Sequence, residues 1–371
     1  GMRMGYSPGS YPMSYRDGNT YQWPDDGVDD FSSDQLLSLY SDGFEGAIDD
    51  PEADEAWKST LRFQDFGEVV EEYGLARSQD SSTGLYLPFL NVLKLWAEVY
   101  GYTGTLDELS RNPDVYPWHL RQKTGDCVAH SKKSHADFVR SYDRVVLKER
   151  ERFICNCDTT MIYAFRGHTG QGASPSRIAN ALKTKGILLA QDYEIDGYGN
   201  LPLSDYSKSI KLGMKWGRSG PPSEIQEEMD DHTIVDVTPV KNRDQLEQAF
   251  RSGLTVSAGS GLGLRGRRGE YGVSVPSGSW AHDMVLAGMD ERKETIEKFG
   301  DSLVCILNSW GPGWIKGPRN IFRSKFWIPE GSCWIKTQEY VRIAVERGSA
   351  CTMVGFRGWP ALSLDDYGVR I

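Results

Sequence analysis

Residues 125–138 read GDCVAHSKKSHADF and place a cysteine at the start of a helical pattern. Gly125 allows a close turn before Cys127, and Ala129 and Ala136 then lie on one face of the predicted helix. The positive end of a helix dipole lies at its N-terminus and lowers the pKa of a thiol placed there. Cys127 is therefore a candidate nucleophile, although a cysteine in this position more commonly serves as a small buried apolar side chain.

A catalytic cysteine needs a base that takes its proton and a group that orients that base. His282 fits the first role, because residues 280–290, WAHDMVLAGMD, place it where a Gly/Ser loop enters an apolar strand. Asn308 fits the second role, because it ends another apolar strand and its amide can hold an imidazole in one tautomer. The other histidines fall in loops or on polar helix faces and are expected to be solvated: His119, His130, His135, His168 and His232.

Two further residues complete the predicted site. Gln122 lies five residues before Cys127, from where its amide can donate a hydrogen bond to a developing oxyanion. Trp310 follows Asn308 and can shield the predicted hydrogen bond between Asn308 and His282 from water. Each residue also has a plain structural interpretation, such as turn formation by Asn308. The order glutamine, cysteine, histidine, asparagine, with each residue in a fitting context, favours catalysis.

These segments resemble the papain-like cysteine peptidases over roughly residues 103–345. Residues 122–127, QKTGDC, resemble the family's oxyanion-glutamine and nucleophile segment, and residues 280–290 resemble its histidine strand. Residues 307–314, LNSWGPGW, resemble the asparagine motif, which is the most specific of the three. Residues 166–187, RGHTGQGASPSRIANALKTKGI, resemble the stretch that holds the family's substrate-binding glycines.

The resemblance implies a role for each of these residues. The implied nucleophile, base, orienting amide and oxyanion donor are, in that order, Cys127, His282, Asn308 and Gln122. Gly170 and Gly172 would bind the backbone of an extended peptide, and Trp310 would lie beside the same substrate site. The implied substrate is a peptide or protein, and no metal or organic cofactor is needed. Two departures from the family pattern stand out: Gln122 is one residue closer to the cysteine, and the two glycines are separated.

Helical patterns come first along the chain and strand-like runs come later, which predicts an α+β fold. Predicted helices include residues 87–101 and 174–186, where Ser174 can cap the helix start. The predicted strands are apolar runs at residues 254–260, 284–290, 303–310 and 340–346. The family resemblance implies two subdomains: a helical left one that carries the nucleophile helix, and a β-rich right one that carries His282 and Asn308.

The domain organisation is expected to have four parts. The first 55 residues, 1–55, form a flexible arm rich in Gly, Tyr and Asp. Residues 56–102 form a helical extension, which is either a propeptide-like segment or a structural addition. The papain-like catalytic domain covers residues 103–345, and residues 346–371 form a C-terminal tail.

Composition narrows the function further. The chain of 371 residues carries a net charge of −10, which argues against nucleic-acid or anionic-membrane partners. It contains no run of apolar residues long enough to span a membrane and no apolar leader at the start of the given sequence. The six cysteines are too sparse for a disulfide framework, and Cys155 and Cys157 are expected to be free thiols without a metal. A cytoplasmic or virion-associated location is expected.

The sequence favours a cysteine peptidase, a thiol protease that hydrolyses peptide bonds through an acyl-enzyme. One alternative is a non-catalytic structural or assembly protein on the same fold, for example of a phage or another large particle, docking through its terminal arms. A second alternative is a transferase, because the same triad can pass an acyl group to an amine. The complete set of Cys, His and Asn favours an enzyme over a scaffold.

Overall fold

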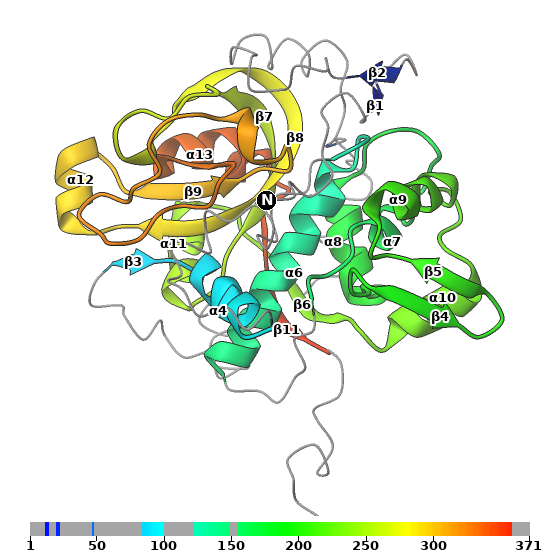
Figure 1. The fold of residues 1–371 in the computed structure, drawn as a ribbon. Coiled ribbons are helices and arrows are strands. Elements are labelled where there is room, and N and C mark those ends of the chain that lie inside the picture. Colours follow the sequence, from blue (N-terminus) through cyan, green and yellow to red (C-terminus); the bar gives the residue numbers. More distant parts are fainter. Residues whose placement is uncertain are drawn as a thin grey trace, which may run out of the picture.

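The computed structural model (Figure 1) describes residues 12–14, 20–22, 47, 84–99, 122–147 and 155–357. Most of the expected arm at 1–55 and much of the expected extension at 56–102 lie outside these ranges, as does His119. Two short strands, β1 (Pro12–Ser14) and β2 (Thr20–Gln22), pair antiparallel near the N-terminus.

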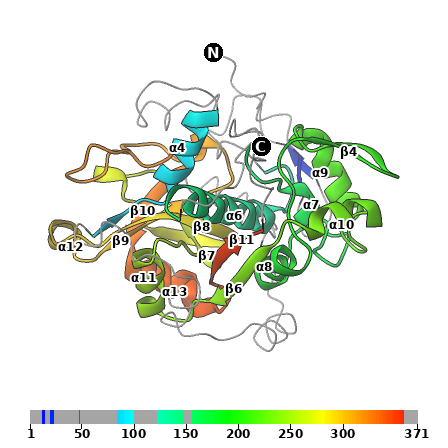
Figure 2. The same ribbon diagram turned by 90° about the horizontal axis from the view of Figure 1, so that it is seen from below.

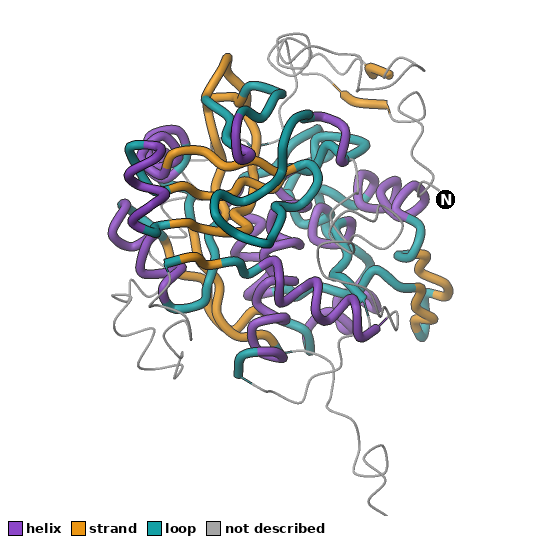
Figure 3. The backbone as a smooth tube through the Cα atoms, turned by 60° about the vertical axis from the view of Figure 1, so that its left-hand side comes forward, coloured by secondary structure: helices purple, strands orange, loops and turns teal. Residues whose placement is uncertain are grey.

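The described body has a mainly helical lobe and a lobe built on a large sheet, in agreement with the α+β prediction (Figures 1 and 3). The helical lobe consists of α6 (Cys127–Val145), α7 (Thr160–Tyr163), α8 (Pro175–Thr184), α9 (Tyr206–Lys215) and α10 (Ser223–Asp230), with the hairpin β4 (Asp192–Ile195) and β5 (Gly199–Pro202). The start of α8 follows its sequence signals, because Ser174 accepts a hydrogen bond from the backbone of Arg177 and Pro175 occupies the first turn.

The second lobe is built on a seven-stranded antiparallel sheet with the order β10-β9-β8-β7-β11-β6 and with β3 paired to β8. Its strands are β3 (Leu85–Tyr86), β6 (Ile234–Pro239), β7 (Ser257–Leu264), β8 (Pro276–Asp290), β9 (Leu303–Leu307), β10 (Ser332–Lys336) and β11 (Cys351–Phe356). Its helices are α4 (Phe89–Val99), α11 (Arg243–Arg251), α12 (Lys293–Phe299) and α13 (Thr337–Ile343), with single 3₁₀ turns at Glu270–Gly272, Pro312–Trp314 and Val345–Arg347.

Helix α6 lies between the two lobes. It contacts β8 and β11 of the sheet, α4 beside it, and α7 and α8 of the helical lobe (Figure 2). Because α6 is covered on all these sides, its polar residues are buried as well as its apolar ones. His130, Lys132 and His135 are buried, so the expectation that both histidines are solvated is wrong. His232 is buried too, at the edge of the helical lobe.

The C-terminal boundary of the sheet lobe lies further along the chain than the sequence indicated. Residues 351–356, expected to belong to the tail at 346–371, form β11, which pairs with β6 and joins it to β7. The apolar run at 340–346, expected to be a strand, instead contributes to α13 and the turn after it. Short apolar runs fit a buried helix as well as a strand, and here Tyr340 and Ile343 face the core at helical spacing.

Part of the expected extension belongs to the folded body. Helix α4 lies within the predicted range 87–101, and Phe89, Val92 and Leu93 are fully buried in a cluster with side chains of β8 and β9. The indole of Trp96 donates a hydrogen bond of 2.9 Å to Asn156 of the helical lobe. Helix α4 therefore joins both lobes, and it is not a separate layer on their surface.

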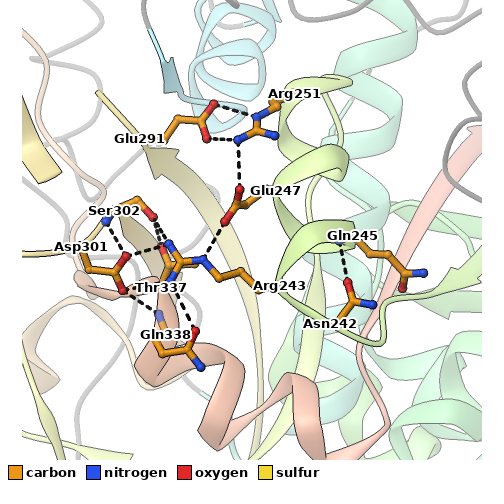
Figure 4. Close-up of polar contacts among 10 residues, drawn as sticks. All are labelled: Asn242, Arg243, Gln245, Glu247, Arg251, Glu291, Asp301, Ser302, Thr337 and Gln338. Carbon is orange, nitrogen blue, oxygen red and sulfur yellow. Dashed lines mark hydrogen bonds and ion pairs between the residues drawn. The ribbon is translucent and has the colours of Figure 1, made fainter. Parts of the chain in front are cut away.

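An ion-pair network fastens α11 to the ends of the central strands (Figure 4). Arg243 contacts Asp301, just before β9, at 2.7 Å, and also Glu247 at 2.7 Å. Arg251 contacts Glu291, just after β8, at 2.6 Å. These side chains are partly exposed, so the network adds modestly to stability and mainly fixes where α11 lies on the sheet. None of the described helices combines the length and the apolar character needed to cross a bilayer.

Candidate active site

His282 and Asn308 meet where strand β8 passes the end of β9. The imidazole Nε2 lies 2.6 Å from Oδ1 of Asn308. The same Oδ1 accepts the backbone N–H of Ser309 at 2.7 Å, so this atom is an acceptor and Nε2 must donate to it. Nδ1 of His282 then carries the lone pair, and it has no hydrogen-bond partner among the described residues. The site thus holds a histidine in one tautomer with its basic nitrogen available.

Two tryptophans pack against this histidine, and a third supports one of them. The Trp310 ring lies 4.7 Å from the His282 ring, centroid to centroid, at an interplanar angle of 30°. Trp280 meets the same imidazole edge-on, and Trp314 packs on Trp310. Trp310 is 2% exposed, so in this structure it covers the His282–Asn308 pair and presents no free face to a substrate.

Cys127 is the first residue of α6 and is fully buried. The backbone N–H groups of Val128 and Asp283 lie near its sulfur, and both act to lower the pKa of the thiol. The first contact reflects the unpaired N–H groups of a helix start. The second comes from the strand residue that follows His282. Helix α6, which begins at Cys127, thus packs against β8, the strand that carries His282.

The electrostatics of the closed site favour neutral side chains. Burial raises the pKa of the Cys127 thiol well above its usual value, and the nearby carboxylates of Asp283 and Asp126 raise it further. Burial lowers the pKa of His282 to about 4, against the opposing effect of the hydrogen bond to Asn308. The sequence-based expectation of a thiol with a lowered pKa is therefore wrong for this closed state, because desolvation outweighs the helix terminus.

Gln122 is held in the loop before Cys127. Its side-chain oxygen accepts the hydroxyl of Ser309 at 2.7 Å, and its backbone N–H donates to the carbonyl of Ser309 at 2.8 Å. The amide nitrogen donates to the carbonyl of Thr124 at 2.9 Å, which leaves its second N–H. The loop that carries Gln122 is thus tied to the residue that follows Asn308, despite the short spacing to the cysteine.

The glycine segment lies against the same loop. Gln171, between Gly170 and Gly172, accepts the N–H of Gly125 at 2.7 Å and the hydroxyl of Thr124. Gly172 has a φ of +81°, a conformation that side chains rarely adopt. The separated glycines therefore still reach the nucleophile loop, and the glutamine between them makes the connection.

Ala47 lies across the region between the two lobes. It forms a parallel bridge with Ala173, next to the glycine segment, and donates its backbone N–H to the carbonyl of Ala281 at 3.1 Å. A β-carbon built on Gly259 would lie 3.7 Å from the Ala47 methyl group. One residue of the N-terminal region therefore makes backbone contacts on both sides of the site, next to His282 on one side.

Sequence reasoning missed a cluster of three polar side chains next to the nucleophile: Asp126, His130 and Tyr206. Asp126, directly before Cys127, is buried and accepts the hydroxyl of Tyr206 from α9. His130 contacts both residues, at 3.2 Å from the carboxylate and 3.0 Å from the hydroxyl. The sequence of α9 lies in a polar stretch without a strong pattern, so only the GDC motif could have drawn attention to this acidic residue. Within the described residues, no group of three or more His, Cys, Asp or Glu side chains is placed to hold a metal ion.

No protein-family model and no curated protein matches the sequence. Solved structures with similarity include xylellain, a cysteine protease from Xylella fastidiosa, with 15% identity, a TM-score of 0.42, and coverage of 64% of this chain and 82% of that chain. Another is the digestive procathepsin L 3 of Tenebrio molitor, with 9% identity, a TM-score of 0.40, and coverage of 89% and 99%. A third is a cysteine protease of Carica candamarcensis, with 16% identity, a TM-score of 0.36, and coverage of 64% and 92%. The fold of the described residues is α+β.

Proposed function

We propose that this protein is a cysteine peptidase that hydrolyses peptide bonds with Cys127 as nucleophile, His282 as base and Asn308 as the residue that orients the base. The observation that carries the proposal is the hydrogen bond of 2.6 Å between His282 and Asn308. Asn308 fixes the tautomer that leaves Nδ1 as a proton acceptor, and the thiol lies near the backbone N–H of the neighbouring residue of the same strand.

In the first half of the reaction, Nδ1 of His282 takes the proton of the Cys127 thiol as the sulfur forms a bond to the scissile carbonyl carbon. The carbonyl oxygen becomes an oxyanion. The backbone N–H of Cys127 and the remaining N–H of the Gln122 amide are the donors proposed for it. When the C–N bond breaks, the leaving amine takes the proton from His282 and a thioester remains.

In the second half, His282 accepts a proton from a water molecule as the water oxygen attacks the thioester carbonyl. The C–S bond then breaks, the sulfur recovers the proton from His282, and the carboxylic acid product leaves. Every proton taken by the histidine is returned within the cycle. Neither half needs a metal or a redox cofactor.

An extended peptide is the proposed substrate. Ala47 already makes the kind of contact such a peptide would make, because it bridges to Ala173 and donates to the carbonyl of Ala281. The proposed binding strip is the segment from Gly170 to Ala173, whose backbone lies beside the nucleophile loop. In this proposal Trp310 does not contact the substrate, and its ring packs on the His282 imidazole and holds it in place. Docking to a larger assembly through the terminal arms stays a prediction, since most of residues 1–55 and residues 358–371 lie outside the described ranges.

The proposal is tested with a peptidyl epoxide, which alkylates a cysteine only when its thiolate is activated beside a bound peptide. Adducts on the full chain are mapped by peptide mass spectrometry. We expect a single adduct on Cys127, its loss in His282→Ala, and its retention in His232→Ala, which removes another buried histidine away from the site. Adduct formation that is unchanged in His282→Ala, or absent from the parent even at long times, would favour the non-catalytic scaffold.

A further inference from the structure

A buried ion pair connects the nucleophile helix to the histidine strand. Nζ of Lys132, on α6, lies 3.3 Å from one carboxylate oxygen of Asp283 and 3.5 Å from the other. Both side chains are completely buried. Lys132 follows Cys127 by five residues, or about 7.5 Å along the helix axis at 1.5 Å per residue. Asp283 is the residue directly after His282.

Asp283 contacts α6 at two points. Its carboxylate binds Lys132, and its backbone N–H lies near the Cys127 sulfur at the start of the same helix, where it favours the thiolate. Successive side chains of a strand point to opposite faces, and Asp283 shares its face with Val285 and Ala287, which pack toward α4 and α6. The sheet already fixes how β8 lies between β7 and β9, and the contacts of Asp283 add the distance and direction of β8 relative to α6. The orientation of the preceding residue, His282, is then fixed as well.

The lysine is held from the sheet as well. Its ammonium donates to the hydroxyl of Ser257, on β7, at 2.9 Å, and Nδ1 of His135 lies 2.8 Å from the same hydroxyl. The hydroxyl can accept from the lysine while it donates its own hydrogen to Nδ1, which is the arrangement expected for a neutral imidazole. Burial and the positive charge of Lys132 both lower the pKa of His135, in agreement with this arrangement.

Stability alone is a poor explanation for this pair. Removing two charges from water costs several kcal/mol per ion, and apolar side chains of similar size commonly serve as well or better. Buried polar groups surround the pair, with Ser257 and His135 bonded beside it, so this contact between α6 and the sheet is a polar network. A buried ion pair does fix distance and direction, because its strength depends on geometry.

We propose that Lys132 and Asp283 are positioning residues for the proposed peptidase reaction, and that their buried ion pair holds the strand so that the His282 imidazole faces the Cys127 thiol. The inference rests on the proposed function. It assigns no contact with substrate to either residue, since both act through the nucleophile helix and the histidine strand.

The test measures how strongly His282 activates Cys127 in several backgrounds. Alkylation of Cys127 by iodoacetamide at pH 7 is followed by mass spectrometry on the full chain, with and without His282→Ala. The reagent reaches Cys127 only when the covered site opens, and this opening affects the rates with and without His282→Ala equally. The ratio of the two rates therefore reports how strongly the imidazole activates the thiol. In the parent we expect His282→Ala to slow alkylation by about 10². In the Lys132→Met background we expect His282→Ala to slow alkylation by less than about twofold. An effect that small would mean that the imidazole no longer activates the thiol.

Lys133→Met is the matched control. Lys133 is the next residue of α6 and is also buried, but its ion-pair partner at 3.8 Å is Asp137 on the same helix, so it does not reach β8. We expect it to lower the thermal midpoint as Lys132→Met does and to keep the parental ratio. The double variant Lys132→Met/Asp283→Asn leaves no buried charge unpaired, and we expect it to recover the thermal midpoint but not the ratio.

Three outcomes would overturn the inference. A parental ratio in Lys132→Met, an equal loss in Lys133→Met, or a ratio restored together with stability in the double variant would each reduce the pair to a structural contact. If His282→Ala has no effect in the parent, the proposed function itself fails and there is nothing for the pair to position. The first three results leave the peptidase proposal intact, and the last does not.

Discussion

Burial favours the neutral forms of Cys127 and His282, because it raises the pKa of the thiol and lowers that of the imidazole. The Cys127 sulfur lies near two backbone N–H groups, which favour the thiolate, and near two carboxylates, which oppose it. Burial then decides the balance. We expect a thiolate and an imidazolium to form only when the site opens and a peptide or water replaces the groups that now cover it. The closed chain should therefore be a poor enzyme.

The lowered pKa of His282 makes stability depend on pH. Its pKa is about 4 in the folded protein and close to 6.5 in the unfolded chain, so between these values the unfolded chain binds the extra proton. Stability is therefore lost as the pH falls from about 6.5 toward 4. From pH 7 to pH 5 we expect His282 to contribute a loss of roughly 2 kcal/mol, measured by urea unfolding.

A His282→Gln chain provides the comparison, because glutamine does not titrate. Its stability should change less than that of the parent between pH 7 and pH 5. His135, whose pKa is also lowered by burial, remains in both chains and cancels in the comparison. Between pH 7 and pH 8 the two chains should change alike. Equal losses below pH 7 would mean that His282 is solvated in the folded protein.

At the scale of helices and strands, local signals predicted most of what they could reach. The capped helix at α8, the helix at α4 and the strands of His282 and Asn308 all lie where periodicity and turn residues place them. Cys127 begins α6 and Asn308 directly follows β9, as the local patterns predict, whereas His282 lies in the middle of β8, which begins earlier than the expected loop at residues 276–279 allows. The sequence could not show which faces of each helix or strand are buried by other elements, since those elements are distant in the chain.

Helix α6 shows this limit most clearly. Its apolar positions predicted one buried face, but Lys132, Lys133 and His135 on the other face are buried too. A helix between two lobes has no solvated side, and nothing local in the sequence distinguishes it from a surface helix. The same is true of Tyr206, whose helix has a weak pattern and whose hydroxyl nevertheless binds Asp126. The burial and contacts of these residues can be recognised only from the three-dimensional arrangement of the two lobes.

The contact of Ala47 predicts that the N-terminal region restrains the site. Its backbone bonds to Ala281 and bridges to Ala173, and a larger charged side chain has little room beside Gly259. We expect Ala47→Glu to speed the alkylation of Cys127 at least about tenfold, which corresponds to about 1.4 kcal/mol of lost restraint. Ala47→Gly keeps the backbone contacts and should alkylate like the parent. If both variants alkylate at the parental rate, Ala47 does not restrain access.

At the scale of the whole molecule, the two lobes are held together by more than the catalytic domain expected at 103–345. Helix α4 precedes that range and β11 follows it, yet both contact α6. Phe89 and Leu93 are fully buried, and Trp96 bonds across to Asn156. A removable inhibitory segment should leave a folded enzyme behind. Any such segment in this chain must therefore end before residue 84, the first residue of the block that contains α4.

This boundary separates two truncated chains. A chain of residues 103–371 lacks α4 and β3 and exposes the cluster that Phe89, Val92 and Leu93 cover. Each buried apolar side chain contributes roughly 1.5–3 kcal/mol, so losing three approaches the whole net stability of about 5–15 kcal/mol of a typical domain. We expect this chain to be insoluble or to lack a cooperative thermal transition. A chain of residues 84–371 keeps the cluster and loses Ala47, so it should unfold cooperatively and alkylate at Cys127 faster than the full chain. A stable, cooperatively unfolding 103–371 chain would show that α4 is a dispensable addition, as one sequence-based interpretation of residues 56–102 allows.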